Sequence, residues 1–383
     1  MAAAVISSCA TPPDSQPNAD GDSVTADMVL HSSPLAGSDV DLSRSQIDIL
    51  ALDDEMSAFL DEHVNRRGSQ HEKLAQLVMA VIGQDTFLLA YDDSTSTASD
   101  TFRNRRGNCI SFTNMFISMA RHLGLDASYQ EVEIPADWSM EGQTYLFSQH
   151  INVLVALRKS PDRVVDFNTY SFRTPSDGLV ISDQRARAHY FNNLGVEFML
   201  ADNTALAYAN FRHSLREDKD FGSAWINLGV LHRKEGLVNY AEAAYMEAME
   251  HNGTKLMSMS NLANLYMQEG KIEQAEYYLA RVQTHRMNNP YYRYQLANTA
   301  FVDGNYESAI ENLKFAIRKR KDEDRFFYLL SLSYLMKGEK ETAEEWMKKA
   351  EEAALESESR QKYHHKLDLL MGRNNGIQGV EGI

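Results

Sequence analysis

The chain has 383 residues, of which 43% are hydrophobic and 24% charged, a composition typical of a globular protein with two or three domains. The formal net charge of −16 argues against nucleic acid as a partner, because binding to phosphates needs clustered Lys and Arg. The only two cysteines are Cys9 and Cys109, which excludes a disulfide scaffold and a zinc site with several cysteine ligands. No apolar run approaches the ~18 residues that a membrane-spanning helix needs.

Residues 1–44 differ in composition from the rest of the chain. They contain six Asp, one Arg, no Lys and no Glu, and they are rich in Ser, Pro and other small residues. No hydrophobic period survives between residues 11 and 43, which predicts a disordered tail.

The sequence Ile6-Ser-Ser-Cys9 resembles the lipobox of bacterial lipoproteins, in which small residues precede a cysteine that is lipidated after signal cleavage. No basic residue precedes Cys9, and the apolar stretch before it is short for a signal peptide. Two alternatives follow: the true start lies upstream, or Cys9 is an ordinary cysteine of the tail. The first would attach the chain to a membrane through Cys9, and it favours the periplasm-facing side of a bacterial cell envelope over the cytoplasm.

Helical patterns open the next segment, residues 45–185. Helices are predicted over 55–64 and 69–82, and apolar residues of the second recur at helical spacing. A third helix is predicted from Cys109 to the residues before Gly124, with a 3–4-spaced apolar stripe that begins at Phe112. Cys109 therefore stands at the start of a helix, directly after Gly107-Asn108, where the helix dipole and free N–H groups stabilise a thiolate.

Three runs that resemble strands follow, over 127–134, 145–157 and 163–167. The second carries His150 and the third carries Asp166. If the loop between them spans 157–161, Asp166 lies opposite Asn152, and His150 becomes its diagonal neighbour at roughly 7–8 Å between Cα atoms. A tight turn at Ser160-Pro161 would place Asp166 further away, so the alternative remains open at this point.

The order of these pieces resembles the transglutaminase-like superfamily over residues 50–170. The matching pieces are Arg106-Gly-Asn-Cys109, the helix end Ala120-Arg-His-Leu-Gly-Leu, His150 and Asp166. The resemblance implies a papain-like arrangement in which these three residues form a catalytic triad that acts on amides through a thioester. Cys109 would be the nucleophile, His150 would carry the proton, and Asp166 would orient the imidazole. The simpler alternative is a buried inert cysteine, a core histidine and a turn aspartate.

The C-terminal half contains a repeat of 34 residues without insertions. Alanine recurs at 207, 241, 275, 309 and 343, each preceded by a leucine thirteen residues earlier. Glycine recurs at 236, 270, 304 and 338, with Asp202 at the equivalent place of the first unit. The pattern resembles the tetratricopeptide repeat (TPR), with two amphipathic helices per unit joined at the glycine and a capping helix over 358–371.

The resemblance to TPR proteins implies a groove that binds a protein or peptide. Asn193, Asn227 and Asn261 share one repeat position, at which asparagines of some TPR proteins hydrogen-bond an extended peptide backbone. The alternative is that these asparagines serve only the packing of the helices.

The sequence therefore predicts an α+β papain-like or transglutaminase-like domain followed by an all-α TPR solenoid. The expected boundaries are a tail over 1–44, the transglutaminase-like domain over 45–185, five repeats with a capping helix over 186–371, and a second disordered tail over 372–383. No cofactor and no metal are expected, because no nucleotide-binding motif or metal-binding histidine pair occurs.

The function that this organisation favours is cysteine-dependent acyl transfer or hydrolysis on protein or peptide amides, with the repeats recruiting a protein partner. The alternative is a scaffold protein without catalysis, in which the transglutaminase-like module is degenerate. Because the triad lies within 45–175, a fragment that ends near Ser182 is expected to keep the reactivity of Cys109.

Overall fold

A computed structural model describes residues 24–35, 40, 47–83, 87–132, 150–158, 160–167, 171–173, 178–354 and 357–370. Cys9 lies outside the described residues, as do Trp138 and Tyr145, two aromatics that precede the His150 strand. The chain divides into two compact units, Met1–Leu279 and Ala280–Ile383. No helix among the described residues combines the length and the apolar character that crossing a membrane requires.

The helices predicted before the strands are confirmed. They are α2 (Asp54–His63), α3 (Gln70–Ile82) and α5 (Cys109–His122), and their N-termini are capped by the side chains of Asp53, Ser69 and Asn108. A further short helix, α4 (Ala98–Asn104), was not predicted, although Thr97 caps it in the same way. The described part of the segment also contains two short parallel strands, β1 (Ala90–Tyr91) and β2 (Arg106–Gly107).

A five-stranded sheet follows in the order β6-β5-β4-β3-β7. Its strands are β3 (Asp126–Val132), β4 (His150–Ala156), β5 (Arg163–Asp166), β6 (Ser171–Arg173) and β7 (Leu179–Ile181). All neighbours in the sheet are antiparallel. In β4 and β5, Val153 pairs with Val165 and Val155 with Arg163, so the wider loop between these strands is the one that forms.

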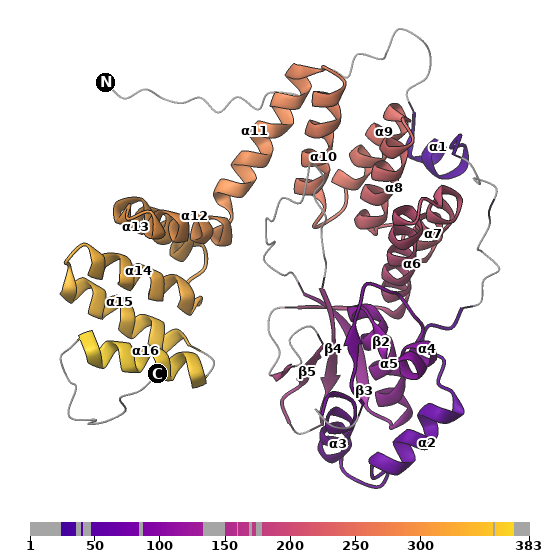
Figure 1. Cartoon of the computed structure of the whole chain (residues 1–383), viewed down its shortest axis with the longest axis horizontal. Helices are drawn as coiled ribbons and strands as arrows, with labels where there is room; N and C mark the ends of the chain where they lie inside the picture. Colours follow the sequence, from indigo (N-terminus) through magenta and orange to yellow (C-terminus); the bar gives the residue numbers. More distant parts are fainter. Residues whose placement is uncertain are drawn as a thin grey trace. The chain divides into compact units, whose positions relative to one another are not determined.

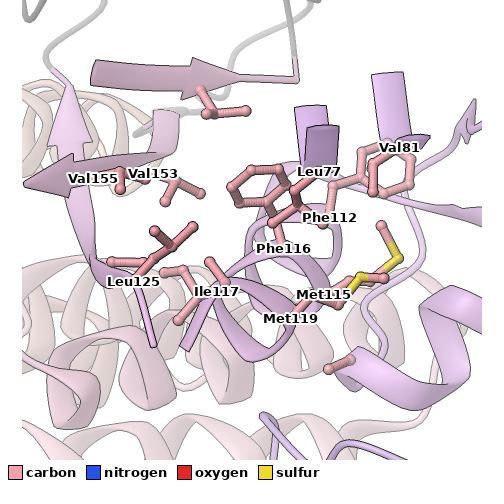
Figure 2. Packing of buried hydrophobic residues seen from close by; sticks show 14 of the residues in the cluster. Leu77, Val81, Phe112, Met115, Phe116, Ile117, Met119, Leu125, Val153 and Val155 are labelled. Atoms are coloured by element: carbon pink, nitrogen blue, oxygen red, sulfur yellow. The ribbon is translucent and has the colours of Figure 1, made fainter. Parts of the chain in front are cut away.

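Helix α5 lies alongside strands β3 and β4 (Figure 1). Its apolar residues meet those of α3 and β4 in one core, in which Phe112, Phe116 and Val153 are fully buried. Figure 2 shows these side chains between the ribbons of the helices and the sheet. Burying an aromatic or aliphatic side chain of this size contributes about 1.5–3 kcal/mol, so this core fixes α5 against the strand that carries His150.

The first unit also contains the first repeats. Their helices are α6 (Asp183–Leu200), α7 (Thr204–Glu217), α8 (Gly222–Lys234), α9 (Val238–Met249) and α10 (Lys255–Gln268), and α11 (Ile272–Asn288) runs across the division between the units. The two helices of a repeat pack closely where a small residue on one contacts an aromatic ring on the other. A Cβ on Gly195 of α6 would lie 2.4 Å from Cε1 of Phe211 of α7.

The second unit contains α12 (Pro290–Val302), α13 (Tyr306–Lys319), α14 (Asp324–Met336), α15 (Lys340–Ala353) and α16 (Ser357–Leu370). Helix α16 lies where the capping helix is expected, and its Tyr363 and Leu367 are buried against α15 and α14. The predicted turns between the helices of a repeat are confirmed. The left-handed φ values are +57° at Asp202, +76° at Gly236, +71° at Gly270, +76° at Gly304 and +84° at Gly338. The predicted fold class is therefore correct: an α+β domain is followed by helical repeats.

The transglutaminase-like domain and the first repeat are joined by ion pairs, of which those of Glu131 are partly buried. Arg185 of α6 donates to Glu131 of β3 at 2.8 Å, and His189 of α6 hydrogen-bonds the same carboxylate at 2.6 Å. Arg121 of α5 pairs with Asp183 at 2.6 Å. The predicted domain boundary at 185/186 falls inside the first unit, Met1–Leu279, and these ion pairs cross it or lie beside it.

Part of the N-terminal segment for which composition predicts disorder is a helix instead. Helix α1 (Ala26–His31) lies beside α9 (Figure 1), with Val29 fully buried. Tyr208 Oη donates to the carbonyl oxygens of Val29 and Leu30, at 2.8 and 3.0 Å. A helix of six residues is unstable alone, so its contacts with the repeats rather than its own sequence pattern explain it.

Candidate active site

Cys109 is the first residue of α5, and the helix begins there because Asn108 caps it. Oδ1 of Asn108 accepts a hydrogen bond from the backbone N–H of Ser111 at 3.1 Å. The N–H of a first helical residue has no partner within its helix, so the N–H of Cys109 is a candidate donor to an oxyanion. Cys109 itself is half-buried and forms no disulfide.

The turn before Cys109 requires glycine. Gly107 has φ of +154°, and a Cβ at this position would lie 2.7 Å from Cβ of Ser111. Only glycine accommodates both the backbone conformation and this close approach. The turn therefore delivers the chain into α5 with the thiol at its N-terminus.

His150 and Asp166 form a buried pair on neighbouring strands. His150 opens β4, where it pairs with Val132 of β3. Continuing the register of β4 and β5 by one residue places Asp166 opposite Asn152, as predicted from the wider loop. The imidazole Nε2 then lies 2.8 Å from Oδ1 of Asp166, and the two side chains are 7% exposed each.

The thiol of Cys109 also lies near the imidazole, close enough for its charge to raise the pKa of His150. Nε2 is engaged by Asp166, so Nδ1 is the ring nitrogen that remains for a proton transfer with the thiol. Burial alone would lower the pKa of His150, but the hydrogen bonds and charges of Asp166 and Cys109 outweigh it and raise the pKa to about 9. The three residues that the sequence singled out therefore meet in one place.

This arrangement can carry out a defined chemistry. At neutral pH an imidazole with a pKa of about 9 is protonated, so it can face a thiolate as a cation and later donate a proton to a leaving amine. Asp166 accepts from the opposite nitrogen and holds the ring orientation. Among the described residues no group of three or more His, Cys, Asp or Glu could hold a metal ion.

Tyr91 is a neighbour of Cys109 that the sequence did not indicate. It pairs with Gly107 across the two short strands, its ring meets that of Phe112 edge-on at 6.4 Å, and it is 53% exposed. Burial and the nearby charges of Cys109 and two aspartates raise its pKa. A two-residue strand has too short a pattern to predict, so no sequence signal pointed to it.

The asparagines proposed for partner binding have different environments. Asn193 and Asn227 are half-buried, and Nδ2 of Asn227 donates to Oδ1 of Asn192 at 2.8 Å. Asn261 is fully buried. Because of this burial it does not face a partner, and its side-chain amide has no hydrogen-bond partner in the described structure.

Comparisons with known proteins agree with this organisation. The model of the transglutaminase-like superfamily matches residues 59–151, which include Cys109 and His150, while Asp166 lies beyond the match. The model of the tetratricopeptide repeat matches residues 294–356. No curated protein matches the chain.

Solved structures show similarity over about half of the chain. The MamA protein is 20% identical over 46% of this chain and 95% of its own, with a TM-score of 0.24. YrrB, described as a TPR protein with an unusual peptide-binding site, is 17% identical over 47% and 91%, with a TM-score of 0.24. PilF of Pseudomonas aeruginosa is 14% identical over 50% and 95%, with a TM-score of 0.26.

The chain thus contains a transglutaminase-like domain followed by tetratricopeptide repeats, as the sequence predicted.

Proposed function

We propose that this protein is a cysteine-dependent enzyme that transfers or hydrolyses the acyl groups of protein or peptide amides. The thiolate of Cys109 attacks the amide carbon, and the carbonyl oxygen becomes an oxyanion beside the N–H of Cys109. The carbon–nitrogen bond then breaks as His150 gives its proton to the departing amine. The thioester that remains is taken by water or by a second amine, which returns the sulfur to its starting state.

The observation that carries this proposal is the placement of one imidazole between a thiol and a carboxylate. A core histidine needs only one satisfied hydrogen bond, yet His150 interacts with both Asp166 and Cys109 while almost fully buried. Desolvating a cation costs free energy unless charged partners compensate it, so a raised pKa at this site supports a catalytic role. A cysteine at a capped helix start, reached by the same ring, has the position of an activated nucleophile.

The repeats would recruit the partner, which we take to be the acyl donor or a protein associated with it. Asn193 and Asn227 are the candidate contacts, because they lie at equivalent positions of α6 and α8 and are partly exposed. Hydrogen bonds to a bound backbone are worth about 0.5–1.5 kcal/mol each, so replacing both by alanine should weaken partner binding by about fivefold or more.

The test is covalent labelling of the full chain with a glutamine analogue that carries a chloromethyl ketone in place of the amide. Wild type should acquire one label at Cys109, faster than a free peptide thiol does, and Cys109→Ala should acquire none at that position. His150→Gln should slow the reaction, while His365→Gln, on the exposed face of α16, serves as the matched control.

Labelling of Cys109 no faster than that of a free thiol would refute the proposed enzymatic function. The alternative would then remain, a scaffold protein with a degenerate transglutaminase-like module. In that case Cys109→Ala should also leave partner binding by the repeats unchanged.

A further inference from the structure

Residues 92–97 form a loop that wraps around the first turn of α5, beside Cys109. The carbonyl oxygen of Ser94 accepts from the backbone N–H of Asn108 at 3.0 Å and from Oγ of Ser111 at 3.1 Å. The same Oγ accepts from the backbone N–H of Ser96 at 2.8 Å. The position of the nucleophile therefore depends on the position of this loop.

The loop is in turn held by a residue of the first TPR helix. The backbone N–H of Thr95 donates to Oε1 of Glu197, on α6, at 2.7 Å. Oγ1 of Thr95 accepts from Nδ2 of Asn108 at 2.8 Å, and Asn108 is the residue that caps the Cys109 helix. Two hydrogen bonds through Thr95 thus connect a carboxylate of the repeats to Asn108, the residue before the nucleophile.

This connection is shielded from water. Thr95 and Asn108 are each only 7% exposed, and burial raises the pKa of Glu197. Hydrogen bonds in such surroundings are directional and costly to leave unmade, so the relay resists rearrangement. The nearby charges of Asp92 and Asp93 also raise the pKa of Glu197.

We propose that Glu197 is a positioning residue for the nucleophile, which holds Thr95 and, through it, the Asn108 cap that sets the geometry of Cys109. The first TPR helix is then part of the catalytic framework rather than only a module for partner binding. The inference rests on the proposed function, because it assigns a role toward the same cysteine. Asn193, a candidate partner contact, precedes Glu197 by one turn of α6, on the same face of the helix.

The experiment measures the rate at which iodoacetamide alkylates Cys109 in the full chain, across pH, for variants of Glu197. Glu197→Ala removes the acceptor and should slow alkylation about tenfold, since small displacements of a reacting group have effects of this order. Glu197→Gln keeps an acceptor oxygen for Thr95, so it should restore the rate to within about twofold of wild type. Glu250→Gln, an exposed carboxylate after α9, is the matched control and should match wild type.

A second pair of variants keeps the idea testable if Glu197→Ala fails to fold. Thr95→Val removes only the hydroxyl that accepts from Asn108 and should slow alkylation, whereas Thr95→Ser should not. Where Glu197→Ala does fold, its combination with Thr95→Val should be no slower than the slower of the two single variants if both residues act through one relay.

The outcomes separate the two proposals. If wild-type Cys109 is activated and Glu197→Ala and Thr95→Val both react at the wild-type rate, the positioning role is overturned while the proposed function stands. If wild-type Cys109 reacts no faster than a free thiol, the proposed function itself fails.

Discussion

Replacing Asp166 by asparagine removes the charge opposite His150 while nearly preserving the shape of the side chain. The pKa of His150 is about 9 in the native protein, against 6.5 for a free imidazole. The loss of an opposite charge in hydrogen-bond contact lowers such a pKa by about 1–3, so a value near 7 is expected in the variant. At pH 8 the protonated fraction of His150 should then fall from about 90% to about 10%.

The assay is a titration of the His150 ring by NMR, with the resonance assigned through His150→Gln. Alkylation of Cys109 at pH 8 provides a second measurement, which should slow about tenfold in Asp166→Asn as the protonated fraction falls. Asp126→Asn, an exposed aspartate of β3, is the matched control. A titration midpoint in Asp166→Asn equal to that of wild type would show that Asp166 does not set the charge of His150.

The same change has a defined effect on stability. The pKa of His150 is higher in the folded chain than in the unfolded chain, so its contribution is fully present below pH 6.5 and disappears as pH rises through about 9. The difference between 6.5 and about 9 corresponds to about 3 kcal/mol. The gap in unfolding free energy between wild type and Asp166→Asn should therefore be largest near pH 6 and narrow toward pH 9, as measured by urea denaturation.

Three further changes test the framework around the site. Gly195→Ala should cost about 1–3 kcal/mol in urea denaturation, because its Cβ would lie 2.4 Å from the ring of Phe211; an unchanged midpoint would contradict the observed packing. Glu131→Gln should cost about 3 kcal/mol at pH 7, since it removes the negative charge that Arg185 and His189 both contact. The pKa of Glu131 is lowered to about 2, so this cost should shrink as pH falls from about 4.5 toward 2 and should not grow. Ser33→Ala removes the 2.9 Å hydrogen bond to His232 and should speed hydrogen exchange in α1 by about fivefold, whereas exchange in α5 should stay as in wild type.

Features with a repeated or alternating pattern could be predicted from the sequence. The 34-residue period predicted five pairs of helices. The glycines at its turns have the left-handed conformation that their spacing indicated. The pairing of β4 with β5 followed from alternation once the loop length was chosen, and the geometry of His150 and Asp166 followed from that pairing. These arguments succeed because periodicity determines which side chains share a face.

Features that depend on single contacts between distant segments could not be predicted. Helix α1 has no hydrophobic period, and it is stabilised by Tyr208, which is 179 residues from Val29. Strand β1 has two residues, too few to show a pattern. The contact of Glu197 with Thr95 spans 102 residues, and nothing in the repeat pattern distinguishes Glu197 from a solvated glutamate of a helix face.

The contact between Glu197 and Thr95 changes which part of the chain is expected to be needed for the reactivity of Cys109. The triad residues lie within 45–175, which alone suggests that a fragment ending near Ser182 keeps its reactivity. Such a fragment lacks Glu197 of α6, which holds the loop around the Cys109 helix, and Arg185, which pairs with Glu131 of β3. Because Glu131 neighbours the residue that pairs with His150, the missing helix supports both the nucleophile and the strand of its base. The first repeat is therefore better regarded as a structural part of the candidate active site, and a partner held at Asn193 would bind to the same helix that positions Cys109.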